Sequence, residues 1–164
     1  MPNRNAKEVM SAVVVTLSPD DDIYGAMTTL LKKKISSAPV IDGQKRLVGI
    51  LSEKDCLRIL TGAAFDGMPE GTVASYMTGP VETLTPDTSV YDIVHRFLGR
   101  AFHQMPVVDE EGNVLGLVRR RDVLRAIEDM RDNSYLYGTA DQQLPLDEGV
   151  GVDSAMRRAR SQKH

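Results

Sequence analysis

The sequence predicts an α+β protein made of two copies of one small unit, each running strand, helix, strand, strand, helix. A gap-free shift of 67 positions aligns residues 10–60 with residues 77–127 and gives 15 identities in 51 positions. Unrelated sequences would give roughly three, so the chain is an internal duplication. Within each copy, the apolar residues change between strand-like runs and helix-like faces. Any function must therefore be inferred from both units together.

Each copy opens with an extended run that stops at a proline. Residues 13–17 form a β-branched run that predicts a strand, and residues 81–84 repeat it in the second copy. Residues 6–10 predict a short helix that leads into the first copy.

A helix follows each of these strands. Residues 20–22 are three aspartates suited to cap its start, and residues 87–89 take this place in the second copy. Apolar residues then recur at helical spacing and predict a core-facing side. That side comprises Ile23, Ala26, Met27, Leu30 and Leu31 in the first copy, and Val90, Ile93, Val94, Phe97 and Leu98 in the second.

A hairpin and a closing helix complete each copy. A short apolar strand ends at Asp42 or Asp109, and a second apolar strand after the turn predicts an antiparallel hairpin. The crossover before it is long enough to set the opening strand parallel to one arm. Because one such unit buries little surface, we expect both copies to share a core. The closing helix holds Cys56, Leu57 and Leu60, or Val123, Leu124, Ile127 and Met130.

The duplication sets the expected domain limits. The first unit spans residues 6–61 and the second spans residues 73–131. Residues 62–72 contain three glycines and a proline, which predicts a linker. From residue 132 the helical periodicity fails and the end is basic, so residues 132–164 are expected to form a partly disordered C-terminal tail.

Composition excludes several classes of function. The chain has 164 residues, a formal charge of −3 and one cysteine, Cys56. The charge gives no reason to expect nucleic acid, and one cysteine excludes an internal disulfide and a cysteine-rich metal site. No apolar run could span a bilayer, so we expect a cytoplasmic protein with no membrane contact. No motif of a known catalytic class is present, so we expect neither an enzyme nor a metal site.

The second hairpin strand contains a glycine in each copy, Gly49 and Gly116, where a strand normally prefers a side chain. Such a glycine marks the close approach of a ligand or of another backbone segment. Both explanations remain open from the sequence.

An acidic residue follows each glycine near the start of the closing helix. Ser52 and Asp55 have the spacing of a helix capping box, which is the simpler explanation of this pair. In the second copy Arg119 replaces the serine, whereas Asp122 keeps its place. A carboxylate kept while its cap partner changes indicates a role in accepting hydrogen bonds, for example from ribose hydroxyls.

Basic residues gather at the same point of the second copy. Arg119, Arg120 and Arg121 stand at the N-terminal end of a helix, where free amide groups favour an anion such as phosphate. His103, shortly before the second Pro-Val step, is a further polar candidate. For any one of these residues, a solvated surface charge is the simpler explanation.

Together these motifs resemble a pair of CBS domains, a Bateman module, over about residues 6–130. The matching segments are the Val-Met and Tyr-Met lead-ins, Thr-Leu-Ser/Thr-Pro-Asp, Pro-Val-Ile/Val-Asp and Gly-Ile-Leu-Ser-Glu-Lys-Asp. The resemblance implies tandem CBS domains that pack through their sheets with pseudo-two-fold symmetry and commonly form homodimers. It also implies clefts that in many members hold AMP, ADP, ATP or S-adenosylmethionine, with no required cofactor.

The family pattern Gly-x-x-Ser/Thr-x-x-Asp implies roles for particular positions. Gly49, Ser52 and Asp55 match it in full, with the aspartate as the ribose ligand. The second copy has Arg119 in place of the hydroxyl residue, which leaves that role unfilled. The implied ligand-binding set is Val14, Thr16, Ala38, Pro39, Ser52, Asp55, Val81, Thr83, His103, Met105, Pro106, Arg119, Arg121 and Asp122.

Two functions follow from this set. The leading hypothesis is a stand-alone regulatory module that binds an adenosine compound in its clefts and so changes its contact with an unknown regulated protein. The alternative is a structural module with empty clefts that serves dimerisation and protein interaction. We expect a homodimer under both.

Overall fold

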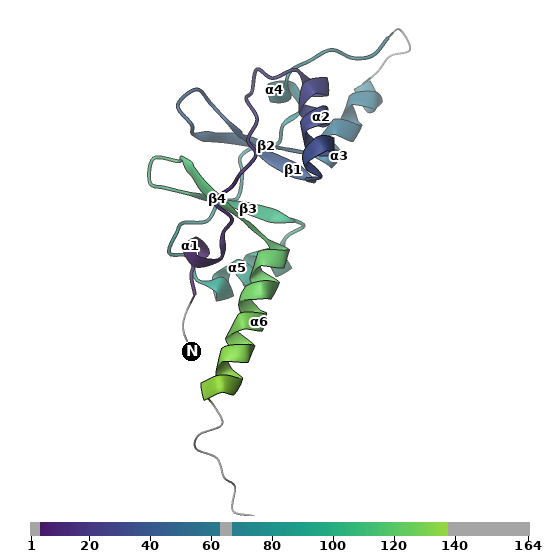
Figure 1. Ribbon diagram of the computed structural model, residues 1–164. Helices are drawn as coiled ribbons and strands as arrows, with labels where there is room; N and C mark the ends of the chain where they lie inside the picture. The colour runs from purple at the N-terminus through teal and green to yellow at the C-terminus, as the bar shows by residue number, and fades with distance from the viewer. Residues whose placement is uncertain (1–3, 63–66, 138–164) are drawn as a thin grey trace, which may run out of the picture. The chain divides into compact units, whose positions relative to one another are not determined.

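The computed structural model describes residues 4–62 and 67–137 (Figure 1). Each repeat contains an antiparallel hairpin flanked by helices, which confirms the α+β class and the duplication. The first repeat contains α2 (Ile23–Lys33), β1 (Ser37–Ile41), β2 (Leu47–Ser52), α3 (Glu53–Leu57) and the 3-10 helix η1 (Arg58–Gly62). The second contains α5 (Val90–Gly99), β3 (Gln104–Val108), β4 (Val114–Arg119) and α6 (Arg120–Tyr137). Two one-turn helices, α1 (Ala6–Val9) and α4 (Val73–Tyr76), serve as lead-ins.

The opening strand of each copy is reduced to a single bridge. Leu17 pairs in parallel with Val40, and Leu84 pairs in parallel with Val107. The parallel direction is therefore confirmed, but the strands predicted over residues 13–17 and 81–84 are wrong beyond this one residue. The reason is Pro39 in the first copy and Pro106 in the second, because the next rung of each ladder would need the backbone N–H that proline lacks.

Within residues 4–62 and 67–137, the core clusters of buried apolar residues are two, not the one shared core that we expected. Each cluster includes the one-turn lead-in helix that belongs, by sequence, to the other repeat. Val73 of α4 belongs to the cluster of the first repeat, and Ala6 of α1 belongs to the cluster of the second. The two repeats thus exchange lead-in segments, and each core is incomplete without a piece of chain from outside its own repeat.

Several side chains predicted to face the core lie on the surface instead. Helices α2 and α5 begin at the predicted caps, Asp22 and Ser89. Their last apolar residues, Leu31 and Leu98, are however 75% and 79% exposed. The residues Leu57, Leu60, Leu124 and Ile127 of the closing helices are exposed as well.

The last helix extends into the segment expected to form the tail. Helix α6 continues to Tyr137, past the predicted start of the tail at residue 132. Residues 138–164 of that tail, and residues 63–66 of the predicted linker, lie outside the described residues. None of the helices over residues 4–62 and 67–137 has the length and apolar character needed to cross a bilayer.

The two strand glycines are explained by the exchanged segments. A Cβ atom on Gly49 would lie 2.6 Å from Met77 Sδ and 3.2 Å from the carbonyl oxygen of Thr78. A Cβ atom on Gly116 would meet the side chain of Met10 and lie 2.9 Å from the carbonyl oxygen of Ser11. Of the two explanations that the sequence left open, close packing of the chain therefore accounts for both glycines.

Replacing Gly116 with alanine tests this packing. Because a backbone oxygen faces the new methyl group, we expect Gly116→Ala to lower the free energy of unfolding by about 1–3 kcal/mol. Gly43→Ala is the control, since a Cβ atom there meets nothing within 4 Å. Urea denaturation measures both variants, and equal stability of the two would contradict the packing explanation.

Candidate functional site

The two repeats meet along pairs of equivalent residues. Gln104 Nε2 donates to the carbonyl oxygen of Ser37 at 3.0 Å and also contacts Ser37 Oγ. At the hairpin turns, Arg46 forms a bridge with Asn113. Both pairs join positions that are 67 residues apart, the shift of the duplication. An internal pseudo-two-fold axis therefore passes between the partners of each pair.

Asp55 is buried at the first turn of α3, with 3% of its surface exposed. Its Oδ2 accepts hydrogen bonds from Ser52 N at 2.9 Å and from Ser52 Oγ at 2.8 Å. Its Oδ1 accepts from Thr78 Oγ1 at 2.9 Å and from Arg58 Nη1 at 3.3 Å. The predicted capping box is confirmed, since Ser52 Oγ also accepts from Asp55 N. The bond to Thr78 adds a link to the segment that enters the second repeat.

Asp122 holds the equivalent place in α6 with fewer partners. Its Oδ2 accepts a hydrogen bond from Arg119 N at 2.9 Å, and its Oδ1 lies 3.9 Å from Arg125 Nη1. Its side chain is 14% exposed, against 4% for Asp55. Ser11, the equivalent of Thr78, donates instead to the carbonyl oxygen of Val13. The two carboxylates thus share a backbone position and differ in how many donors they hold.

The exchanged lead-in segments run past both carboxylates of the predicted site. Thr78 pairs with Ile50 of β2 and contacts Asp55, and the chain then continues to Val81 and Thr83. Ser11 pairs likewise with Leu117 of β4, and the chain then continues to Val14 and Thr16. Each carboxylate therefore has the opening segment of the other repeat beside its strand.

Thr78 is a residue that sequence reasoning missed. It lies outside the Gly-x-x-Ser/Thr-x-x-Asp spacing, and its contact with Asp55 spans 23 positions. The only available indication was indirect, because Gly49 and Gly116 required some segment to approach β2 and β4 closely.

The remaining predicted residues differ widely in exposure. Ala38, Pro39, Met105 and Pro106 are fully buried in the two cores, so a ligand could reach at most their backbone atoms. His103 and Arg121 are exposed. The half-buried members of the set are Val14, Thr16, Ser52, Val81, Thr83, Arg119 and Asp122.

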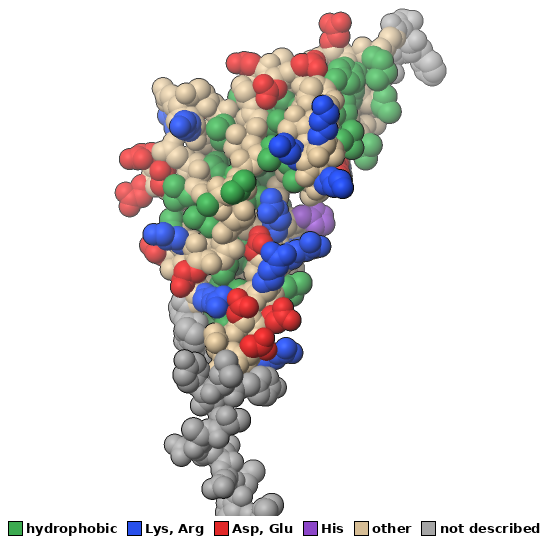
Figure 2. All heavy atoms as spheres, in the orientation of Figure 1, with side chains coloured by type: hydrophobic (Ala, Val, Ile, Leu, Met, Phe, Trp, Pro, Cys, Tyr) green, Lys and Arg blue, Asp and Glu red, His purple; other side chains and the backbone are tan. Residues whose placement is uncertain are grey.

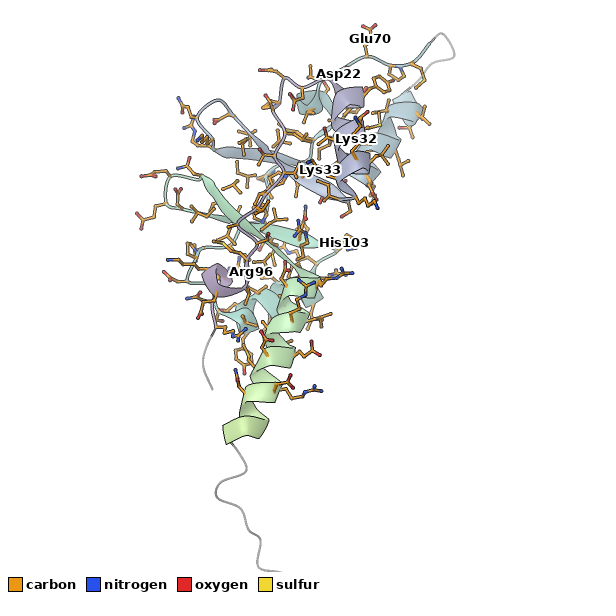
Figure 3. All side chains as sticks on the ribbon, viewed as in Figure 1. Asp22, Lys32, Lys33, Glu70, Arg96 and His103 are labelled. Carbon is orange, nitrogen blue, oxygen red and sulfur yellow. The ribbon has the colours of Figure 1, made fainter. Side chains whose placement is uncertain are left out.

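Basic side chains gather on one face where α2 ends and α6 begins, with a histidine beside them (Figure 2). Lys33 of the first repeat and His103 of the second lie on either side of the boundary between the repeats, which we call the junction (Figure 3). Among the described residues, the guanidinium groups of Arg119 and Arg121 have no hydrogen-bond or ion-pair partner, whereas Arg120 lies over the ring of Phe97 at 6.0 Å. This face is suited to an anion.

One cavity includes predicted site residues, and a second is lined by other residues. A cavity of about 300 Å³ lies between the repeats and includes the predicted residues Val81 and Thr83. Its other lining residues are Leu47, Val48, Pro80, Val108 and Gly112. A second cavity of about 740 Å³ carries the carboxylates of Asp20, Asp22 and Glu70, two of which are labelled in Figure 3. Like charge makes this second cavity unfavourable for a phosphate group.

Nucleophilic and metal chemistry find little support in the described residues. Cys56 is buried, and desolvation, followed by the nearby charge of Asp55, raises the pKa of its thiol. A thiol with a raised pKa carries less thiolate and is a poor nucleophile. Among the residues that the structure describes, no group of three His, Cys, Asp or Glu side chains could hold a metal ion.

Comparison with known proteins identifies the fold. The family model for the CBS domain matches residues 6–62 and again residues 73–129. The chain belongs to the CBS domain family. A curated relative, an uncharacterised 17.7 kDa protein of Acidianus ambivalens, is 30% identical over 78% of this chain and 76% of its own length. Inosine-5'-monophosphate dehydrogenase of Methanocaldococcus jannaschii is 28% identical, but the match spans 74% of this chain and only 23% of the enzyme.

Solved CBS pairs match over almost their whole length. CBSX2 in complex with AMP has a TM-score of 0.70 and 26% identity, with 77% of this chain and 98% of that chain covered. The CBS domain pair of MJ0100, in complex with 5'-methylthioadenosine and S-adenosyl-L-methionine, has a TM-score of 0.68 and 26% identity over 79% and 99% of the two chains. The tandem CBS architecture is therefore established for this protein.

The bond between Thr78 and Asp55 can be tested by removing the hydroxyl. Thr78→Val keeps the shape of the side chain and removes one donor from a buried carboxylate, so we expect unfolding to cost about 1 kcal/mol less. Thr28→Val is the matched control, because its hydroxyl bonds only within α2, to the carbonyl oxygen of Tyr24. Chemical denaturation compares the two variants, and no difference between them would show that the link does not stabilise the fold.

Proposed function

We propose that this CBS pair is a regulatory module that binds an adenosine-containing small molecule where the repeats meet. The observation that carries the proposal is the placing of a carboxylate, Asp55 or Asp122, beside a strand paired with the opening segment of the other repeat. Ribose hydroxyls are donors that a carboxylate in this position can accept. The complexes of two similar CBS pairs, with AMP and with S-adenosyl-L-methionine, support the same ligand class.

The charge of the junction favours a nucleotide over S-adenosylmethionine. Arg119 and Arg121 have no anionic partner among the described residues, and the backbone N–H of Arg120, between them, donates to the carbonyl oxygen of His103 at 3.4 Å. Lys33, from the first repeat, lies across from His103 (Figure 3). A phosphate would gain charge-assisted hydrogen bonds there, whereas the sulfonium group of S-adenosylmethionine would add a positive charge. AMP, ADP and ATP are therefore the preferred candidates.

Ligand binding at this junction would have a regulatory rather than a catalytic effect. A ligand that contacts both repeats binds best to one relative arrangement of them, so it shifts the population toward that arrangement. A partner protein that contacts both repeats would respond to the shift. We propose that the module is cytoplasmic, and that it performs no reaction itself.

We further propose that the module is a homodimer formed through its exposed helical leucines. Under the shift of 67 positions, Leu31 corresponds to Leu98, Leu57 to Leu124 and Leu60 to Ile127. All six are exposed, on α2, α3 and η1 in one repeat and on α5 and α6 in the other. Figure 2 shows hydrophobic side chains along the helices of the first repeat. A surface that repeats with the internal two-fold suits an equally symmetric partner, which a second copy supplies.

One observation favours the alternative function, a dimerisation and interaction module without a ligand. The carboxylate of Asp55 is already bonded to four donors of the protein itself, so it does not require a ligand to be stable. Thermal unfolding with added ligand separates the two functions.

Thermal unfolding with added ligand tests the proposed function. A compound present at 100 times its dissociation constant stabilises the folded protein by about 2.7 kcal/mol, which is readily seen as a rise in Tm. We expect this rise with AMP, ADP or ATP and a smaller one with S-adenosylmethionine. GMP, which differs from AMP only in its base, is the control. No rise with any adenosine compound would leave the interaction module as the function.

The dimer can be tested by charging its surface. We expect Leu124→Glu to give a monomer by size-exclusion chromatography with light scattering, because burying an unpaired carboxylate in an interface is strongly unfavourable. Val13→Glu is the control, since Val13 is 84% exposed but lies outside the helices. A wild-type chain that is monomeric at all concentrations, or a dimer insensitive to Leu124→Glu, would contradict the proposal.

A further inference from the structure

We infer that the two carboxylate sites are unequal, and that a phosphorylated adenosine binds on the side of Asp122, with Arg119 as the residue that holds its phosphate. This inference rests on the proposed function, because it concerns which of the two equivalent sites carries it. It reverses the expectation from the sequence, where the complete motif of Ser52 and Asp55 makes the first site the better match.

The first observation is the number of acceptor positions that each carboxylate has left. An ionised carboxylate offers about four lone-pair positions. Asp55 uses them for Ser52 N, Ser52 Oγ, Thr78 Oγ1 and Arg58 Nη1, at 2.8–3.3 Å. A ribose hydroxyl would have to compete with these donors for the carboxylate, which costs free energy.

Asp122 has room for the same ribose. It accepts one hydrogen bond, from Arg119 N, and its other oxygen has only the longer contact of 3.9 Å with Arg125. The donor that fills the equivalent position at Asp55 has turned away, because Ser11 Oγ donates to the carbonyl oxygen of Val13. Asp122 can therefore accept hydroxyl donors without giving up bonds of its own.

The second observation is the charge beside each carboxylate. The three residues that lead into Asp55 are Ser52, Glu53 and Lys54, whose formal charges of −1 and +1 cancel. The equivalent three residues before Asp122 are all arginines and carry +3. A phosphate is therefore attracted to the second side and not to the first.

Arg119 is the arginine best placed to act. It occupies the position of Ser52, at the end of β4 and three residues before Asp122, and it is half-buried. Its guanidinium group has no partner among the described residues. A guanidinium presents several donors in a rigid plane and binds phosphate with two parallel hydrogen bonds. The serine of the first copy is meanwhile engaged in capping α3.

The cavity of about 300 Å³ does not favour the first side for a nucleotide. It borders Val81 and Thr83, which follow Thr78 in the chain, and it can accept an apolar ring. None of its seven lining residues is charged, and neither Asp55 nor Asp122 is among them. Nothing in this cavity would hold a phosphate.

Calorimetry with AMP and with adenosine as probes tests the inference on the full chain. We expect one AMP per wild-type chain. Arg119→Ala should weaken AMP about tenfold or more and leave adenosine within about twofold, because only AMP carries the phosphate. Asp122→Asn should weaken both probes. Arg131→Ala, which removes an exposed arginine of α6, the helix that follows Arg119, is the matched control for a general loss of charge.

A comparison with the first site completes the experiment. Ser52→Ala should lower Tm through the lost cap and leave the AMP affinity within about threefold. Two equal AMP sites per chain, or a loss of AMP with Ser52→Ala but not with Arg119→Ala, would overturn the inference and leave the proposed function standing. A wild-type chain that binds neither probe, nor ADP, ATP or S-adenosylmethionine, would overturn the proposed function and this assignment with it.

Discussion

The exchange of lead-in segments is the constraint on which the rest of the structure depends. Met10 lies against Gly116, and Met77 lies against Gly49, so each hairpin is completed by chain that enters the other repeat. Neither core is complete without this crossing. The same crossing places Thr78 in hydrogen-bond contact with Asp55. The cap of α3 is therefore also part of the contact between the repeats. The close approach of the lead-ins therefore favours glycine at positions 49 and 116, and it helps to position any site between the repeats.

Local features of this fold were predictable because short-range chemistry determines them. Asp22, Ser52 and Ser89 cap helices through bonds that reach only three residues ahead, which sequence spacing displays directly. The exchange was not predictable, because a shift of 67 positions relates the copies equally whether each lead-in packs on its own repeat or on the other. Helical spacing likewise marks Leu31 and Leu98 as apolar without distinguishing a core from an outer face. Pro39 and Pro106 did carry the information that shortens the opening strands, since each removes one ladder donor.

The two copies separate the requirements of folding from those of chemistry. An aspartate at the third helical position accepts the backbone N–H of residue 52 or 119 in both copies, whatever side chain precedes it. This leaves the preceding side chain free to change, and it has become serine in one copy and arginine in the other. Thr78 and Ser11 diverge in a similar way, because one hydroxyl bonds to the carboxylate and the other to a backbone oxygen. Equal backbones therefore present two junction sides with different numbers of free acceptors and different charge.

This inequality bears on how such a module could report a ligand. Gln104 and Ser37 join the repeats on the pseudo-two-fold axis, and Gln104 is buried. A change in the orientation of one repeat therefore alters this contact with the other repeat. With two identical sites, binding at both would act on this contact symmetrically. With one site that holds a ligand and one whose carboxylate is already satisfied, a single binding event acts on one side of the axis only. The free energy of that event is then available to tilt one repeat against the other, which is the kind of differential contact that coupling to a partner protein requires.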